Sequence, residues 1–318
     1  MPDYFTNMST LLTAIKNRLL AYQDGTLLSV KTYKRGVLPP IPNFPAVVVL
    51  PIRETLKSPR SGGNYRNDRE INIEIYTYGL KTDNILRTCI DLSDAVKDIL
   101  KNEFKMNDAA LNNTYDTVIG NQIYGEPQPF RNAIVQKCTI PIMCRSFESL
   151  PIATFSPTLT EVTPKDLLDE IYDEISAYTY TKTVKIKRKA VMPPMSSYPA
   201  ICVVEDMDEP ERSRSGVDRP VRRFTVAIFE KQLDKEVLLD NLLSIVENVK
   251  DCLQENHRWN DKCENSWVGS VEYGSYMSGN TILYSAYVMM DAYCYEELPK
   301  RFSDSRVAVG DFLRGGGV

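Results

Sequence analysis

Few side chains in this sequence have the spacing that enzymes use. Its one histidine, His257, is followed by Arg258 and Trp259, and no serine or cysteine lies at a spacing known to pair with it. A histidine base acts on a nucleophile or a substrate proton within hydrogen-bond reach. Most zinc and copper sites rely on imidazole, so a single histidine excludes them. We expect His257 to be a surface or helix-end residue and the protein not to be an enzyme.

Phosphate, hard-metal and redox chemistry are equally poorly supported. The longest glycine run, Gly315 to Gly317, is terminal and precedes no helix, whereas a phosphate-binding loop leads directly into one. The acidic run from Asp206 to Glu211 could attract a hard cation but lacks the spacing of a calcium loop. The seven cysteines show neither CxxC nor metal-type spacing, which favours buried thiols in a reduced, cytoplasmic context. The sequence therefore predicts no metal and no cofactor.

Arginine gathers in two polar segments, Lys57 to Arg69 and Glu209 to Arg223, which hold almost no large apolar side chain. The planar guanidinium suits carboxylates on a partner surface, and structureless loops of this length are usually functional or disordered. We predict two mobile loops that become ordered in contact with a partner, with merely solvated loops as the alternative. The candidate assembly-interface residues are Arg60, Arg66, Arg69, Arg212, Arg214, Arg219, Arg222 and Arg223.

The elements that would position these segments occur twice. PPIPNFPAVVVL, from Pro39, is matched by PPMSSYPAICVV, from Pro193, and further matches follow in the same order, such as INIEIYTY with FTVAIFEK. An internal match with a domain-sized period indicates a duplicated domain and not a solenoid. We predict one domain at 1–150, a second at 151–298, and a C-terminal arm at 299–318 that has no counterpart.

Each copy has the same predicted order of elements: helix, three strands, helix, two strands. Apolar residues at helical spacing indicate the two helices of each copy, and Thr163, Pro164 and Asp166 supply the start of one of them. The unbroken apolar runs AVVVL and AICVV predict strands that are buried on both faces. The predicted fold class is α+β, with two tandem homologous domains, each a mainly antiparallel sheet of about five strands with two helices on one face.

Charge divides unevenly between the copies. Residues 1–150 hold 18 Lys and Arg against 15 Asp and Glu, a net of +3, and residues 151–318 hold 20 against 27, a net of −7. Opposite signs suggest that the domains face each other, within or between chains, although drift after duplication would give the same result. The overall acidity argues against a dedicated nucleic-acid binder. No apolar run is long enough for a membrane-spanning helix.

The repeated unit resembles the tail-terminator and tail-completion proteins of tailed bacteriophages. The resemblance rests on the opening helix before a basic strand, the PPxxxxPA turn and apolar strand, the arginine-bearing segment and the long second helix. It covers nearly all of each copy and omits the C-terminal arm. It implies a virion structural protein, without catalytic or cofactor chemistry, that forms a ring at the head–tail junction, terminates the tail tube and docks the tail to the capsid connector.

The resemblance also implies partners and location. The chain would form a homo-oligomeric ring, of six chains or, because the usual family member has one unit per chain, of three, with six favoured. It would contact tail-tube and head-completion or connector proteins, after assembly in the host cytoplasm, and become part of the virion tail or neck. DNA would cross the lumen without sequence-specific binding, and no membrane is involved. The alternatives are a neck or collar ring of the same particle, a cytoplasmic ligand-binding or enzymatic two-domain protein with its pocket between the copies, or a cytoplasmic regulatory or chaperone-like protein.

Overall fold

The structure is a computed structural model of the chain. It describes residues 6–23, 25, 27–36, 43–57, 64–102, 114, 116–149, 163–181, 184–189, 197–211, 217–232, 235–256, 259, 263, 265–278, 281–294 and 296–297. The predicted C-terminal arm at 299–318 lies outside these residues.

The first half of the chain begins with a helix, continues through three strands to a second, longer helix, and ends in a long strand preceded by three short ones. These elements are α1 (Met8–Leu20), β1 (Thr32–Arg35), β2 (Ala46–Lys57), β3 (Asn64–Gly79), α2 (Thr82–Asn102), β4 (Asp116–Ile119), β5 (Ile123–Tyr124), β6 (Gln128–Phe130) and β7 (Ala133–Ser149).

The second half repeats this order, apart from a short 3₁₀ turn at Thr179–Thr181 and a final two-residue strand. Its elements are α3 (Pro164–Ala177), β8 (Ile186–Lys189), β9 (Ala200–Glu211), β10 (Val217–Gln232), α4 (Lys235–Glu255), β11 (Asn265–Ser278), β12 (Thr281–Tyr293) and β13 (Glu296–Glu297). The predicted order of helix, three strands, helix and two main strands is therefore present in each half.

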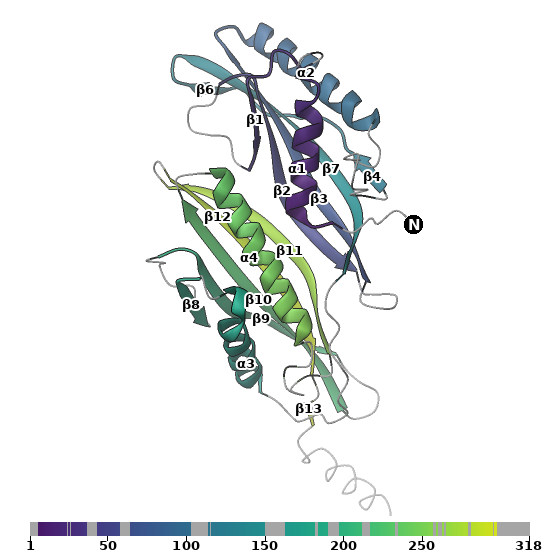
Figure 1. The fold of residues 1–318 in the computed structure, drawn as a ribbon, viewed down its shortest axis with the longest axis vertical. Coiled ribbons are helices and arrows are strands. Elements are labelled where there is room, and N and C mark those ends of the chain that lie inside the picture. The colour runs from purple at the N-terminus through teal and green to yellow at the C-terminus, as the bar shows by residue number, and fades with distance from the viewer. Residues whose placement is uncertain are drawn as a thin grey trace, which may run out of the picture.

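All of these strands belong to one sheet that runs through both halves (Figure 1). The strand order is β4-β7-β3-β2-β11-β12-β10-β9-β8, with β1 beside β2, β13 beside β10, and β5 and β6 beside β7. The pairs β1–β2 and β8–β9 are parallel and the other pairs are antiparallel. The protein is thus α+β, with a large, open and mostly antiparallel sheet and four described helices. This confirms the predicted α+β class and the mainly antiparallel pairing.

The helices cover one face of this sheet. Alternate strand residues such as Ile73 in β3 and Val226 in β10 belong to one apolar cluster with the buried residues of all four helices. Their sequence neighbours point to the opposite face, where Ala227 and Phe229 form a small separate cluster with residues of β9. In Figure 1, α1 and α4 lie on the same side of the sheet, in front of the strands of their own halves.

Several local predictions are confirmed. The run Ala46–Val49 is buried on both faces of the sheet, and so is Ala200–Val203. Helix α3 begins with a capping box in which the Thr163 hydroxyl accepts from the Asp166 backbone and the Asp166 carboxylate accepts from the Thr163 backbone, with Pro164 at the first helical position. All seven cysteines are buried, and none of them forms a disulfide.

The prediction of two long structureless loops is wrong for most of their length. Strand β2 continues to Lys57 and β3 begins at Asn64, so the two form one long hairpin, and β9 and β10 form another. Polar side chains do not prevent strand pairing because the ladder is made by backbone groups. Residues 58–63 and 212–216, between these strands, lie outside the described part of the chain.

Candidate functional site

The two halves are joined edge to edge through β2 and β11. These strands pair antiparallel over three positions, with Thr55, Glu54 and Arg53 opposite Ser270, Val271 and Glu272. The joint is possible because β1 covers only the first part of β2, opposite Ala46–Val49, and leaves the rest of that edge accessible. A single sheet therefore continues from one half into the other (Figure 1). We call this pairing and the side chains around it the internal joint.

A fully buried charge cluster lies at the internal joint. Glu54 of β2 accepts hydrogen bonds through Oε2 from Asn67 Nδ2 at 2.8 Å and Arg69 Nε at 3.1 Å, both in β3. The second half contributes the Lys250 ammonium of α4, whose Nζ lies 3.5 Å from the same oxygen, and the Tyr273 hydroxyl of β11, which donates to Glu54 Oε1. Glu54, Arg69 and Lys250 have no exposed side-chain surface. One carboxylate of the first half is thus held by groups from both halves.

The electrostatics of this cluster favour the charged form of Glu54. Burial alone would raise the pKa of this carboxyl, but the positive charges of Lys250 and Arg69, with hydrogen bonds from Tyr273 and Asn67, outweigh it and lower the pKa to about 2. Burial and the nearby Glu54 charge raise the pKa of Tyr273 well above its usual value, so this hydroxyl remains a donor. Lys250 also lies 3.1 Å from Glu247 of its own helix, so two negative charges match two positive ones.

Further side-chain contacts between the two halves extend the joint beyond the charge cluster. Arg35, at the end of β1, reaches across to Asp240 of α4 with an N–O distance of 2.8 Å. Tyr65 of β3 donates through its hydroxyl to Gln254 of α4 at 3.1 Å. Gly36 has a positive φ of 82°, and a Cβ placed there would meet the Tyr284 hydroxyl of the second half. Helix α4 therefore packs against both halves.

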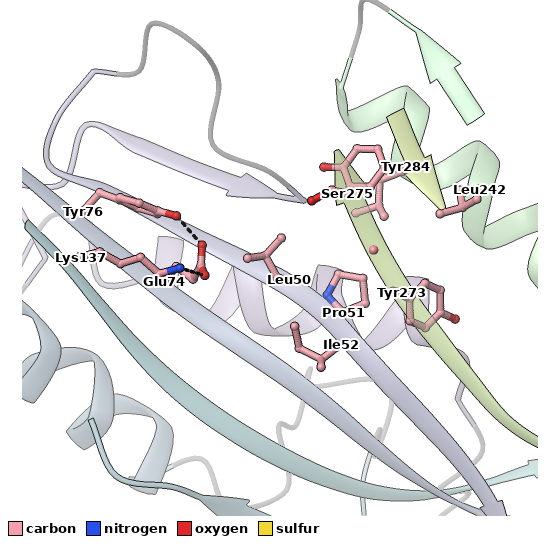
Figure 2. Close-up of a pocket in the computed structure, with 12 residues that line it drawn as sticks. Leu50, Pro51, Ile52, Glu74, Tyr76, Lys137, Leu242, Tyr273, Ser275 and Tyr284 are labelled. Atoms are coloured by element: carbon pink, nitrogen blue, oxygen red, sulfur yellow. Dashed lines mark hydrogen bonds and ion pairs between the residues drawn. The ribbon is translucent and has the colours of Figure 1, made fainter. Parts of the chain in front are cut away.

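A cavity of about 350 Å³ opens beside the joint, between the two halves (Figure 2). Its floor is formed by Leu50, Pro51 and Ile52, the part of β2 that lies between its pairing with β1 and its pairing with β11. Figure 2 shows Glu74, Tyr76 and Lys137 of the first half at one end. The residues from the second half are Leu239, Leu242, Tyr273, Gly274, Ser275 and Tyr284.

Three polar groups of this cavity already bond to one another. Glu74 pairs with Lys137 and accepts from the Tyr76 hydroxyl, as the dashed lines in Figure 2 mark. Burial, followed by the Glu74 charge, raises the pKa of Tyr76 well above its usual value. The cavity thus offers hydroxyl groups, one ion pair and an apolar floor, which suits binding of a small neutral molecule better than acid–base chemistry at neutral pH.

The structure separates the eight candidate arginines into different environments. Arg69 is buried with Glu54, and Arg222 is buried at the matching place in β10, opposite Asp208. Arg66 and Arg223 are partly exposed and pair with Asp68 and Asp291. Arg219 lies in β10 opposite Glu211, with its side chain outside the described part. Arg60, Arg212 and Arg214 lie outside the described residues. Their role at an assembly interface stays a prediction.

The other residues singled out in the sequence lie partly outside the described residues. His257 and Arg258 lie outside the described residues. The acidic run of residues 206–211 lies in β9, where the carboxylate of Asp206 accepts a hydrogen bond from Thr225. In the described part of the chain, no three His, Cys, Asp or Glu side chains are grouped so that they could hold a metal ion. None of the described helices is long and apolar enough to cross a membrane.

Sequence reasoning missed the residues of the internal joint, although one signal was present. Lys250 stands in the apolar stripe of α4, between Val249 and Leu253, and a lysine in a buried stripe needs a partner. Glu54 gave no such signal, because a charged residue in a strand is ordinarily exposed. The contact between them joins residues far apart in the sequence.

No protein-family model and no curated protein matches this chain.

A substitution of Glu54 tests whether the charge cluster holds the halves together. We expect Glu54→Gln to lower the free energy of unfolding by about 3–5 kcal/mol, because two buried cations then face one remaining carboxylate. Urea unfolding followed by circular dichroism measures this change. The double variant Glu54→Gln, Lys250→Met removes one charge of each sign, and we expect it to recover most of the loss. A single variant with unchanged stability would contradict the assigned role of the cluster.

The same carboxyl predicts acid sensitivity. Because the pKa of Glu54 falls from 4.5 to about 2 on folding, the stability that it contributes is complete above pH 4.5 and is lost as the pH falls toward 2. We expect the difference in stability between the wild type and Glu54→Gln to shrink over this range. A difference that stayed constant from pH 6 to pH 2.5 would show that Glu54 does not titrate in this way.

A second buried carboxyl predicts the opposite dependence on pH. Burial raises the pKa of Glu230 in β10 from 4.5 to about 7, although the Lys185 charge acts against the shift. Its Oε2 has no hydrogen-bond partner among the described residues. Glu230 borders a second cavity, of about 570 Å³, which is also lined by Lys185, Lys231, Tyr180 and Tyr198.

Because the pKa of Glu230 is higher in the folded chain, its ionisation destabilises the fold as the pH rises from 4.5 to 7. We expect the wild type to lose stability relative to Glu230→Gln over this window, by up to about 1.4 kcal/mol per pH unit. Thermal unfolding at pH 5, 6, 7 and 8 measures the difference, with Glu126→Gln at an exposed position as the matched control. Parallel curves for the wild type and Glu230→Gln would contradict the prediction.

Proposed function

We propose that this chain is a virion structural protein of a tailed bacteriophage that forms a ring at the head–tail junction. It terminates the tail tube and docks the tail to the capsid connector. The observation that carries the proposal is the order of elements, helix, three strands, helix and two main strands, which both halves have and which resembles the tail-terminator and tail-completion proteins. A ring at this place is built by subunits side by side, and edge-to-edge strand pairing is a means of making such contacts.

The proposal includes a tandem duplication, with domains at 1–150 and 151–298. The repeated strand order supports it: β4-β7-β3-β2-β1 in the first half corresponds to β11-β12-β10-β9-β8 in the second. The ladders support it further, because the pairing of β2 with β3 skips Ile52 and that of β9 with β10 skips Asp206, at matching places. Two related units in one chain would then provide two neighbouring positions of the ring.

The proposed ring consists of copies of this chain, six or alternatively three, and lies in the tail or neck of the particle. Its neighbours are tail-tube and head-completion or connector proteins, and DNA crosses the lumen without base-specific contacts. The protein has no catalytic role in this proposal. A neck or collar ring is the sister possibility. The cavity beside the internal joint favours the other class, a cytoplasmic protein with a ligand between the two halves.

Disruption of the gene in a producing phage tests the proposed function. We expect full heads and free tails of irregular length to accumulate, because an unterminated tube continues to polymerise and offers no docking surface. Electron microscopy of the lysate measures tail length and joining, and expression of the wild-type chain in trans is the control. Tails of normal length that still join heads would favour a collar protein. Absence of the protein from purified particles would contradict the whole class.

The arginine prediction is tested by substitution and not by deletion of the hairpins, since Arg69 and Arg222 are buried. We expect a variant with serine at Arg60, Arg66, Arg212, Arg214 and Arg219 to unfold at the wild-type temperature but to fail in head–tail joining. Complementation of the disrupted gene measures joining. Arg87→Ser, at an exposed position of α2, is the control. Wild-type infectivity of the five-arginine variant would remove these residues as assembly contacts.

The domain prediction is tested by separate expression of 1–150 and 151–318. We expect each fragment to unfold cooperatively, because each half contains its own helices and its own ladders. Each should also be less stable than in the full chain, since the internal joint is lost. Circular dichroism during thermal unfolding gives the result. Two unfolded fragments would mean that the halves are one domain.

A further inference from the structure

The internal joint uses only one edge of each half and leaves the two matching edges at the ends of the sheet. The first half contributes the edge of β2 beyond β1, and the second contributes the edge of β11. Because the strand order is the same in both halves, the corresponding edges are β9 beyond β8 at one end and β4–β5 at the other. In the part of the chain that the structure describes, no strand pairs with either of these edges.

The ladders show which residues of the β4–β5 edge correspond to the joint residues of β11. Ile119 of β4 lies opposite Ile142, and Val268 of β11 lies opposite Met290. Ile142 in turn lies opposite Ile71, and Met290 lies opposite Phe224, which are the first residues of the matched segments INIEIYTY and FTVAIFEK. The positions that correspond are therefore Asn121 with Ser270, Gln122 with Val271, Ile123 with Glu272, and Tyr124 with Tyr273.

The other edge is matched in the same way. Ala46 and Ala200 begin the two ladders, and Glu54 lies opposite Arg69 as Asp208 lies opposite Arg222. Met207, Asp208 and Glu209 of β9 therefore stand where Arg53, Glu54 and Thr55 stand in β2.

The residue types of the charge cluster are repeated on these two edges. The β9 edge has a carboxylate residue and an arginine, Asp208 and Arg222, at the places of Glu54 and Arg69. The β4–β5 edge has a tyrosine, Tyr124, at the place of Tyr273, and α2 has Lys97 at the place of Lys250. The β9 edge thus has the residue types that β2 and β3 bring to the cluster, and the β4–β5 edge with α2 has those that β11 and α4 bring.

Next to the charge cluster, the two end edges differ from the internal joint in one pair of facing residues. In the internal joint, Arg53 lies opposite Glu272 with an N–O distance of 3.8 Å. The corresponding residues on the two end edges are Met207 and Ile123, a pair of apolar residues in place of an ion pair. A single exposed apolar side chain would need no partner, but this edge holds more than one, because Ile123 is 59% exposed and Val118 of β4 is 48% exposed. A paired change from charged to apolar is expected if the two residues meet.

We propose that copies of this chain associate head to tail by repeating the internal joint between molecules. The outer edge of β9 in one copy pairs antiparallel with the β4–β5 edge of the next, so that Met207 faces Ile123. Asp208 of one copy then takes the register position of Glu54, beside Tyr124 and Lys97 of the next copy in the places of Tyr273 and Lys250. In the single copy the Tyr124 hydroxyl lies 2.9 Å from Ser93, whose own hydroxyl donates to the Ile90 carbonyl, so association redirects the Tyr124 proton from Ser93 to the next copy. The partner that fits each edge is a second copy of this chain.

This arrangement is heterologous, since two different edges meet. It therefore generates a closed ring or an open filament and not a two-fold dimer. The inference rests on the proposed function for the premise that the chain assembles with itself, and it deepens that function by naming the surfaces. The charge of the halves agrees with it, because the β9 edge belongs to the half with a net of −7 and the β4–β5 edge to the half with a net of +3.

A double-mutant cycle tests the proposed contact. We expect Ile123→Glu and Met207→Arg each to shift the wild-type oligomer to monomers in sedimentation velocity, because each places one charge opposite an apolar residue. The double variant recreates the Arg53–Glu272 arrangement of the internal joint, and we expect it to restore the oligomer. Leu28→Glu, the same kind of change at a 71% exposed leucine, is the control and should leave the oligomer intact.

Cross-linking distinguishes head-to-tail from two-fold contacts. The native cysteines are buried, so Ile123→Cys and Met207→Cys each add one reactive thiol. We expect a short bismaleimide to link the two variants when they are mixed and to link neither variant to itself. Self-linking of Ile123→Cys would overturn the proposal, and so would a wild-type chain that remains monomeric at every concentration.

The outcomes separate this inference from the proposed function. An oligomer that forms normally in both single variants would overturn the edge pairing while leaving a ring at the head–tail junction possible. A head-to-tail oligomer from a protein that is absent from phage particles would support the pairing and contradict the proposed function.

Discussion

A buried carboxylate at the meeting point of the two halves constrains the rest of the structure. Glu54 has no exposed surface, and an isolated charge in such a place would be strongly unfavourable. Arg69 compensates it from within the first half, and Lys250 and Tyr273 do so from the second. Because the compensation is divided between the halves, strands β2 and β11 must keep their register and α4 must stay close to β3. The pairing that continues the sheet and the compensation of this charge therefore depend on each other.

The one-sided arrangement of the helices makes such edge contacts possible. All four described helices contribute to a single apolar cluster on one face of the sheet, so they do not cover the strand edges. Exposed edges are ordinarily a liability, because unpaired backbone groups attract other strands. In this protein the edges of β2 and β11 pair with each other. The same physical need applies to the two edges at the ends of the sheet, where an exposed isoleucine and an acidic strand replace the paired residues of the joint.

The arginine-rich segments show how far composition predicts structure. Polarity correctly indicates that they add little to the core. It wrongly suggested loops, because a hairpin needs only backbone pairing and compatible neighbours, and Lys57, Arg66 and Asp68 supply such neighbours to each other. Arginines of similar sequence context also separate by strand alternation. Arg69 points to the buried side, whereas Arg66 remains partly exposed beside Asp68.

The sequence by itself determined the elements and their order. Helical stripes, buried apolar runs and the capping residues at Thr163 depend on neighbours within one segment. The matched segments of the two halves indicate the same order of elements twice. The coarse fold class followed from these, because amphipathic helices and half-buried strands have few ways to pack. Only the tertiary structure decided how the halves meet. Lys250 in its apolar stripe indicates that a partner is needed, but neither Glu54 nor Tyr273 signals that it is that partner, since the contact offsets the desolvation of charges that are distant in sequence and adjacent in space.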